Sequence, residues 1–272
     1  MRTISLLFHD VYVADPRESG FQSEGADRYK LPVRDFEAQV AGVAWARPDA
    51  PQLVMNFADT VTSGEVPYLI TVDDGGVSYY TLLADRLETR GWRGHCFVST
   101  GAIGTRGFLT ASQIRELDAR GHVIGSHSVS HPPRFNACDV DRLRREWSHS
   151  RKVLEDLLGR EVTAASVPGG SYSRLVGRTA RDAGFRVLFT SDPTTTTRNQ
   201  DGVLVVGRFT VRHRHPADRA ARLVRRAPWT RYGEWASWHA KGLIRPLLGP
   251  LYVRVADWML REPQRMHQCQ RS

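Results

Sequence analysis

Two short clusters of acidic and histidine side chains stand out in this 272-residue chain. Asp73 and Asp74 follow an apolar run and precede two glycines, and further along the chain His127 and His131 lie four residues apart. One carboxylate and two imidazoles can bind a divalent metal and leave a coordination position open, and such a metal activates water. The second carboxylate can then accept a proton. These residue types indicate a metal-dependent hydrolase.

Each cluster alone has an ordinary explanation. An Asp-Asp-Gly sequence often forms a turn, and a histidine pair arises by chance in a chain with ten histidines. Together, however, each cluster supplies what the other lacks. A carboxylate with two neutral imidazoles suits a borderline metal, so we expect zinc, with cobalt and nickel as alternatives.

Apolar runs alternate with segments of helical periodicity along most of the chain. This alternation predicts βαβ units around a parallel sheet or barrel, whose strands carry catalytic residues at their carboxyl ends. We expect buried strands at residues 3–8, 67–72, 95–99, 122–126, 163–167 and 186–190. We expect helices at residues 31–46, 79–90, 110–120, 139–158, 173–183 and 217–226, and a long loop at residues 11–31.

The two clusters match a known family. Residues 71–75 read Thr-Val-Asp-Asp-Gly, and residues 127–132 read His-Ser-Val-Ser-His-Pro. They resemble the first two motifs of the polysaccharide deacetylases of carbohydrate esterase family 4, Thr-Phe-Asp-Asp-Gly and His-Ser/Thr-x-x-x-His-Pro. The resemblance covers about residues 1–215 and implies an α/β fold, a distorted (β/α) barrel. It implies that the catalytic base is Asp73 and that the metal ligands are Asp74, His127 and His131.

The family's third motif corresponds to residues 166–172, which read Ser-Val-Pro-Gly-Gly-Ser-Tyr. The resemblance implies that backbone there helps to hold an oxyanion. The candidate substrate contacts are Pro168, Gly169, Gly170 and Tyr172. The arginine that often orients the base in this motif is missing, with Ser166 or Val167 near its place. The sequence therefore leaves open how Asp73 is tuned, and the family's fourth motif is not recognisable either.

The family's fifth motif, Leu-x-His, normally lies near the C-terminus and supplies the general acid. This chain has the triplet at Leu7 to His9 instead, as in the circularly permuted branch of the family. The resemblance implies that His9 protonates the leaving amine and that Leu7 lines the acyl pocket. The alternative is that His9 caps a buried strand. His213 and His215 are rival acids, although their arginine neighbours favour a solvated or anion-binding stretch.

Residues 216–272 differ in character from the rest of the chain. Residues 203–272 have a charge balance of +10 and residues 1–202 one of −1, and four of the seven tryptophans lie between residues 227 and 262. We expect a helical appendage that packs on the barrel or contacts an anionic membrane. Nucleic acid is a weaker alternative, since no recognised binding fold accompanies the charge.

Three cysteines without a pattern, no signal peptide and no apolar run of spanning length favour a cytoplasmic protein, with peripheral contact at the inner membrane face as the alternative. The expected reaction is removal of N-acetyl groups from amino sugars of a polysaccharide or lipid-linked glycan, as in exopolysaccharide biosynthesis. Two alternatives stay open. One is an inactive carbohydrate-binding module, which the missing arginine and fourth motif favour, and the other is a deformylase or amidohydrolase acting on another small amide.

Overall fold

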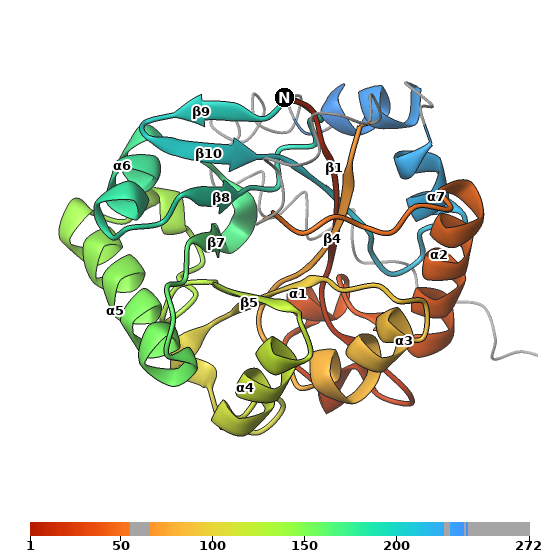
Figure 1. Cartoon of the computed structure of the whole chain (residues 1–272), viewed down its shortest axis with the longest axis horizontal. Helices are drawn as coiled ribbons and strands as arrows, with labels where there is room; N and C mark the ends of the chain where they lie inside the picture. The colour runs from red at the N-terminus through yellow and green to blue at the C-terminus, as the bar shows by residue number, and fades with distance from the viewer. Residues whose placement is uncertain (55–65, 226–228, 237, 239–272) are drawn as a thin grey trace, which may run out of the picture.

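The computed structural model of the protein describes residues 1–54, 66–225, 229–236 and 238. They form one large curved sheet with helices around its outside (Figure 1). The sheet contains, in spatial order, β11 (Arg208–Thr210), β1 (Ile4–Phe8), β4 (Tyr68–Val72), β5 (His95–Val98), β6 (Val123–Ser126), β7 (Ala164–Ser166), β8 (Val187–Phe189), β10 (Val203–Val206) and β9 (Arg198–Gln200). Every pair of neighbours is parallel except β10 and β9.

The helices connect successive strands and cover the outer face of the sheet. The main ones are α2 (Val33–Ala46), the π-helical turn η4 (Tyr79–Leu83) that runs into α3 (Ala84–Glu88), α4 (Ala111–Ala119), α5 (Val140–Leu158), α6 (Arg174–Asp182) and α7 (Arg219–Val224). Shorter elements are β2 (Val11–Tyr12), η1 (Pro16–Glu18), α1 (Glu24–Asp27), β3 (Leu31–Pro32), η5 (Thr100–Ala102), η6 (Phe135–Ala137) and η7 (Pro168–Gly170).

Local sequence signals explain where the long helices begin and end. The Asp139 side chain accepts a hydrogen bond from the Arg142 N–H at the start of α5, and Gly159 ends that helix at φ 69°. Thr110 begins α4 with a capping box, because its hydroxyl and the Gln113 side chain satisfy each other's backbone N–H groups. The predicted helices and strands therefore exist close to their expected bounds.

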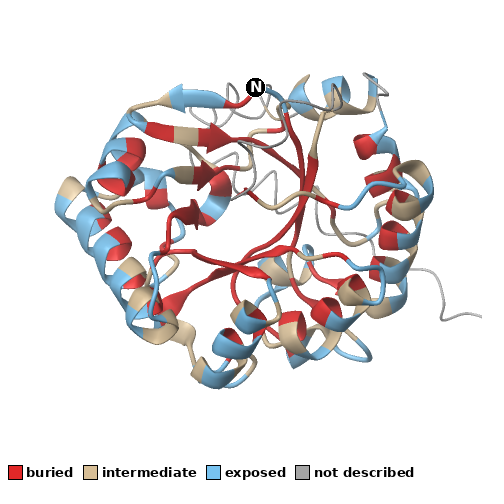
Figure 2. Ribbon diagram, in the orientation of Figure 1, coloured by how far each residue is buried: buried red, intermediate tan, exposed pale blue. Residues whose placement is uncertain are grey.

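The buried side chains form two layers separated by the sheet. The outer layer lies between the sheet and the helices and contains the indole of Trp147 from α5. The inner layer is a smaller apolar cluster that includes Leu69, Phe97, Phe189 and Val206. Figure 2 shows most strands buried along their length, with the edge strand β9 exposed, and the helices exposed mainly on their outward sides. The inner cluster covers part of the inner face of the sheet, and polar residues such as Asp73 and His127 directly follow the ends of β4 and β6.

The sheet curves like a barrel, but its hydrogen-bond ladder is interrupted at one seam. In the described part of the chain, the edge strands β11 and β9 do not pair with each other. The loop before β9 contacts the chain ahead of β1 instead: the Thr3 N–H donates to the Thr195 carbonyl at 2.8 Å, and the Thr197 N–H donates to the Met1 carbonyl at 3.1 Å. The expected distorted barrel is thus an open sheet curved around its inner cluster.

Two sequence expectations were wrong in detail. Residues 11–31 are not a plain loop, because β2, η1, α1 and β3 lie within them. The strands β9, β10 and β11 were not expected between residues 198 and 210. The failure to predict β11 has a physical reason. Arg208 faces the inside of the sheet, while Phe209 packs in the outer core, so a buried charge occupies a strand position where an apolar residue is usual.

The C-terminal appendage is described only at its beginning. The carbonyl of Pro216 accepts a hydrogen bond from the Gln39 amide at 2.7 Å, and the Ala220 N–H donates to the same side chain at 2.8 Å. Helix α7 therefore packs on α2, as expected of a helix on the barrel. The other expectation for this segment was contact with an anionic membrane, and most of the residues that it concerned lie outside the described residues. In the described ranges no helix is long and apolar enough to span a bilayer.

His95 on β5 is buried in the inner layer and acts as a structural connector. Its Nε2 accepts the Val54 N–H at 3.0 Å, and its Nδ1 lies 3.0 Å from the Ile70 carbonyl. This pairing requires the neutral ring with its proton on Nδ1, because a second proton on Nε2 would face a donor. Burial accordingly lowers the pKa of His95 to about 4.

We predict that His95 makes the fold sensitive to acid. Its pKa is lower in the folded chain than the ordinary 6.5, so the unfolded chain binds an extra proton between pH 6.5 and 4. The free energy of unfolding should fall by about 3 kcal/mol as pH drops through that window. Urea unfolding of the metal-free protein from pH 4 to 8 measures this. His95→Gln should flatten the dependence, and the exposed His149→Gln should leave it unchanged; equal slopes in all three proteins would contradict the assignment.

Candidate metal centre and active site

The aspartate pair lies where β4 ends and the chain turns back. Asp73 directly follows Val72, and Asp74 adopts the left-handed conformation at φ 78°, followed by Gly75 at φ 77°. A left-handed conformation at a residue other than glycine costs on the order of 1–3 kcal/mol. The turn is stabilised by the Ser99 N–H, which donates to the Asp74 carbonyl at 3.3 Å. It directs both carboxylates toward the same centre, as the two glycines had indicated.

The histidine pair lies on a similar strained turn after β6. Ser128 has φ 66° and His131 has φ 49°. The Glu146 carboxylate on α5 stabilises the turn by accepting the N–H groups of Val129 and Ser130, each at 2.9 Å. Both imidazoles are thereby presented on one side of a loop rather than on a helix, in agreement with the proline that follows them.

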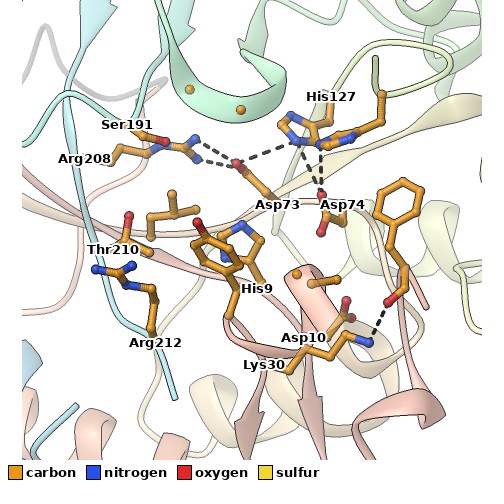
Figure 3. A pocket seen from close by; sticks show the side chains of 18 of the residues that line it. His9, Asp10, Lys30, Asp73, Asp74, His127, Ser191, Arg208, Thr210 and Arg212 are labelled. Atoms are coloured by element: carbon orange, nitrogen blue, oxygen red, sulfur yellow. Dashed lines mark hydrogen bonds and ion pairs between the residues drawn. The ribbon is translucent and has the colours of Figure 1, made fainter. Parts of the chain in front are cut away.

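Asp74, His127 and His131 bring one ligand atom each to a single point. Figure 3 shows Asp74 and His127 facing each other there. The Asp74 Oδ1 lies 3.5 Å from the His127 Nε2 and 3.6 Å from the His131 Nε2. Donor atoms that share one tetrahedral zinc lie about 3.4 Å apart, since each metal–ligand bond is about 2.0–2.2 Å. The His127 Nδ1 lies 2.9 Å from the Ser166 carbonyl, which fixes its proton there and leaves Nε2 free as a donor to a metal.

The charges around this cluster also suit a cation. Burial lowers the pKa of His127, but the carboxylates of Asp73 and Asp74 outweigh it and the net pKa is raised. Burial likewise raises the pKa of Asp74, but the hydrogen bond from His127 and the nearby imidazoles bring it below its usual range. The centre therefore attracts positive charge. The Asp-His-His set fits a divalent metal on both geometry and charge.

Asp73 is held by a fully buried arginine that the sequence analysis did not identify. Arg208 on β11 donates from Nη1 to the Asp73 Oδ1 and from Nη2 to the Oδ2, each at 2.7 Å. Its Nη2 also donates to the Ser166 hydroxyl at 2.7 Å, and that hydroxyl donates to the Asp73 Oδ2 at 3.0 Å. Burial raises the pKa of Asp73, yet the Arg208 guanidinium and His127 hold it well below its usual range.

Arg208 fills the role that the third motif left open. Its guanidinium lies over the rings of Phe97 and Phe189, with Cζ 5.8 and 5.9 Å from their centroids, and its Nε donates to the Thr190 carbonyl at 2.9 Å. Ser166, which stands near the place of the missing arginine, contacts both members of the pair. The only sequence signal for this role was an arginine between apolar residues after Val206, within a strand that was not expected.

His9 lies at the end of β1, beside the metal cluster and facing the same cavity (Figure 3). Its Nδ1 is buried and has no hydrogen-bond partner in the described part of the chain. Burial lowers the pKa of His9 and outweighs the attraction of Asp74 and Asp73. His9 does not cap β1 through a hydrogen bond in the described residues, and this favours a role toward the cavity.

The rival histidines lie elsewhere. The His215 Nδ1 accepts the Arg212 N–H at 3.2 Å and closes a local turn. Neither His213 nor His215 lines the cavity at the cluster. By contrast, β1 lies between β11 and β4, so the Leu-x-His triplet that ends in His9 is next to the strand that leads to the aspartates.

The cavity above the cluster has a volume of about 840 Å³. Leu7, Gly169 and Gly170 line it as expected. Pro168 and Tyr172 are not among its lining residues, because Pro168 is buried and the Tyr172 hydroxyl donates to the Asp201 carboxylate at 2.8 Å. The Gly170 N–H already donates to the Val167 carbonyl at 2.8 Å, so this amide is not available to an oxyanion.

Comparison with known proteins shows similarity to deacetylases of polysaccharides. Residues 61–188 match the model of the polysaccharide deacetylase family. A chitin deacetylase from Pestalotiopsis sp is 29% identical over 156 residues, covering 56% of this chain and 52% of the relative. YxkH of Bacillus subtilis strain 168 is 25% identical over 176 residues, covering 63% of this chain and 62% of YxkH. This chain thus spans less than two thirds of either relative's length.

The fold agrees with the same family. The crystal structure of a polysaccharide deacetylase from Bacillus cereus superposes with a TM-score of 0.68 at 17% identity, covering 83% of this chain and 69% of that chain. The identity is low, so this likeness concerns the α/β fold alone.

We predict that the Arg208–Asp73 pair is strongly coupled. Arg208→Leu should lower the free energy of unfolding by about 3–5 kcal/mol, because it leaves Asp73 buried without its counter-charge. The double variant Asp73→Leu with Arg208→Leu should recover much of that loss, since no charge is then left unpaired. Urea unfolding of the metal-free proteins completes the cycle. Additive losses in the double variant would contradict the coupling.

We predict that the Asp-His-His cluster binds about one zinc ion per chain. His127→Ala with His131→Ala should remove two of the three ligands and abolish binding. Metal content after zinc loading and desalting, measured by mass spectrometry, gives the stoichiometry. The exposed His149→Ala is the matched control and should keep its zinc. Equal zinc in the wild type and the double variant would refute this centre.

Proposed function

We propose that this chain, whose residues 61–188 match the model of the polysaccharide deacetylase family, is a metal-dependent hydrolase that removes N-acetyl groups from amino sugars of a polysaccharide or lipid-linked glycan. The observation that carries this proposal is the convergence of Asp74, His127 and His131 beside the arginine-held carboxylate of Asp73. A ligand cluster and a separate base at one open cavity are what hydrolysis of an amide requires.

Asp73 is the proposed base that accepts a proton from the attacking water. A divalent metal bound by Asp74, His127 and His131 would supply Lewis acidity to that water and to the acyl oxygen. Both oxygens of Asp73 are held by Arg208, so the carboxylate keeps a fixed orientation toward the centre, with its Oδ2 3.8 Å from the His127 Nε2. Its lowered pKa keeps Asp73 ionised at neutral pH.

His9 is the proposed acid that protonates the departing amine. It enters from β1, the strand next to β4, so acid and base reach the reacting group from neighbouring strands. The amide that helps to hold the oxyanion is assigned to Gly169 or Ser171, which also line the cavity. Leu7 offers an apolar surface for the acetyl methyl group.

The alternative of an inactive binding module loses its main support. That reading rested largely on a missing arginine beside the base, and Arg208 supplies one from another strand. Identification of the released acid decides between the deacetylase and the deformylase.

We predict zinc-dependent release of acetate from N-acetylglucosamine oligomers. Asp73→Asn and His9→Gln should each lower kcat by about 10²–10⁴-fold while leaving zinc content unchanged, because they act on proton transfer rather than on metal binding. The exposed Asp85→Asn and His149→Gln should retain full activity.

Acetate and formate are quantified separately in the same assay. Formate release from N-formyl analogues without acetate release would favour the deformylase. Zinc-loaded protein that releases neither acid would contradict the proposed hydrolase.

A further inference from the structure

The inward-facing side of β11 continues past the strand and lines the cavity. Arg208, Thr210 and Arg212 alternate with Phe209 and Val211, and all three polar residues line the cavity while the two apolar ones are buried in the outer core. Side chains on the same face of a strand are about 7 Å apart along it. Arg208 contacts Asp73, and Arg212 lies two such intervals nearer to the carboxyl edge of the sheet.

The main-chain register places Arg212 beside the reacting centre. Leu7 is paired with Thr210, and the Val211 N–H donates to the Leu7 carbonyl at 2.8 Å, so the β1–β11 contact extends beyond the strand. Arg212 thus stands next to His9 across the two strands, and Figure 3 shows its guanidinium facing the same cavity. A substrate whose amide nitrogen meets His9 presents a neighbouring group to Arg212.

Arg212 has no anionic partner in the described ranges of the chain. Its guanidinium carbon lies 5.9 Å from the centroid of the Tyr29 ring, and its Nε is buried without a hydrogen-bond acceptor. A buried donor of this kind costs free energy unless a ligand or water satisfies it. Arginine stacked on an aromatic ring is held ready to bind a planar or tetrahedral oxyanion.

The other two arginine and lysine side chains that line the cavity, Arg208 and Lys30, are already paired, and so is the Glu234 carboxylate. Asp73 is paired with Arg208, and the Glu234 carboxylate is paired with Arg219. Lys30 donates to the carbonyls of Pro16 and Phe21, each at 2.7 Å, and is paired with Asp27 at 3.1 Å. Of the cations that line the cavity, Arg212 is the one whose contacts among the described residues include no acceptor.

We propose that Arg212, stacked on Tyr29, binds an anionic group, a carboxylate or a phosphate, on the sugar that carries or adjoins the acetamido group. The inference rests on the proposed deacetylation for the identity of the sugar, but the anion site itself does not depend on that reaction. An anion site at Arg212 would make an acidic glycan or a sugar phosphate the preferred substrate, rather than a neutral amino-sugar polymer.

Equilibrium binding tests the site directly. N-acetylglucosamine, N-acetylglucosamine 1-phosphate and glucuronate are titrated by calorimetry into wild type, Arg212→Gln and Arg144→Gln. Arg144, an exposed residue of α5 paired with Asp141, is the matched loss of one positive charge away from the cavity. Titrations are made both with zinc and after chelation, because phosphate can also bind a metal.

Arg212→Gln should weaken binding of the phosphate or the carboxylate by about tenfold or more, with neutral N-acetylglucosamine unaffected. Arg144→Gln should bind like the wild type. Which of the two anions loses affinity identifies the group that the site recognises. Equal anion affinities in wild type and Arg212→Gln, or an equal loss in Arg144→Gln, would overturn the proposal.

A second variant tests whether lost binding in Arg212→Gln reflects misfolding. Arg212→Lys keeps the positive charge and the aliphatic side chain but lacks the planar guanidinium, so it should retain phosphate binding better than carboxylate binding. Acetate release is recorded in parallel. Anion binding that depends on Arg212 without any acetate release would refute the deacetylase alone, and acetate release without Arg212-dependent anion binding would refute the anion site alone.

Discussion

The buried ion pair between Arg208 and Asp73 is the constraint on which the rest of the site depends. A carboxylate at the end of β4 can remain charged inside the sheet only if a counter-charge accompanies it. Arg208 provides that charge through two parallel hydrogen bonds, and Phe97 and Phe189 enclose the guanidinium. The pair fixes the direction of the Asp73 carboxylate, and Ser166 links it to the imidazole of His127.

The strained turns around this pair serve the same end. Asp74, Ser128 and His131 all adopt left-handed backbone conformations, which point a carboxylate and two imidazoles at one small volume. Strain of this kind persists where surrounding contacts determine the geometry, as the Glu146 carboxylate does for the histidine turn. A metal site prepared in this way needs little rearrangement when the ion binds.

The curved sheet separates stability from chemistry along its strands. Apolar side chains such as Leu69 and Val206 cover part of its inner face, and polar residues such as Asp73 and His127, which follow the last residues of β4 and β6, line the cavity. Arg208 in β11 pairs with Asp73, and Arg212, two residues beyond that strand, lines the cavity. This short segment connects the candidate active site to the proposed recognition of an anion.

The sequence by itself determined the parts that depend on local signals. Alternating apolar runs and helix caps predicted most strands and helices, and adjacent residues in two motifs identified Asp73, Asp74, His127 and His131. The tertiary structure decided what joins them: the seam that leaves the sheet open, the placement of His9 beside the cluster and the pairing of Arg208 with Asp73. Arg208 lies far from Asp73 along the chain and on a three-residue strand, so their pairing follows from strand order and burial, which no local pattern encodes.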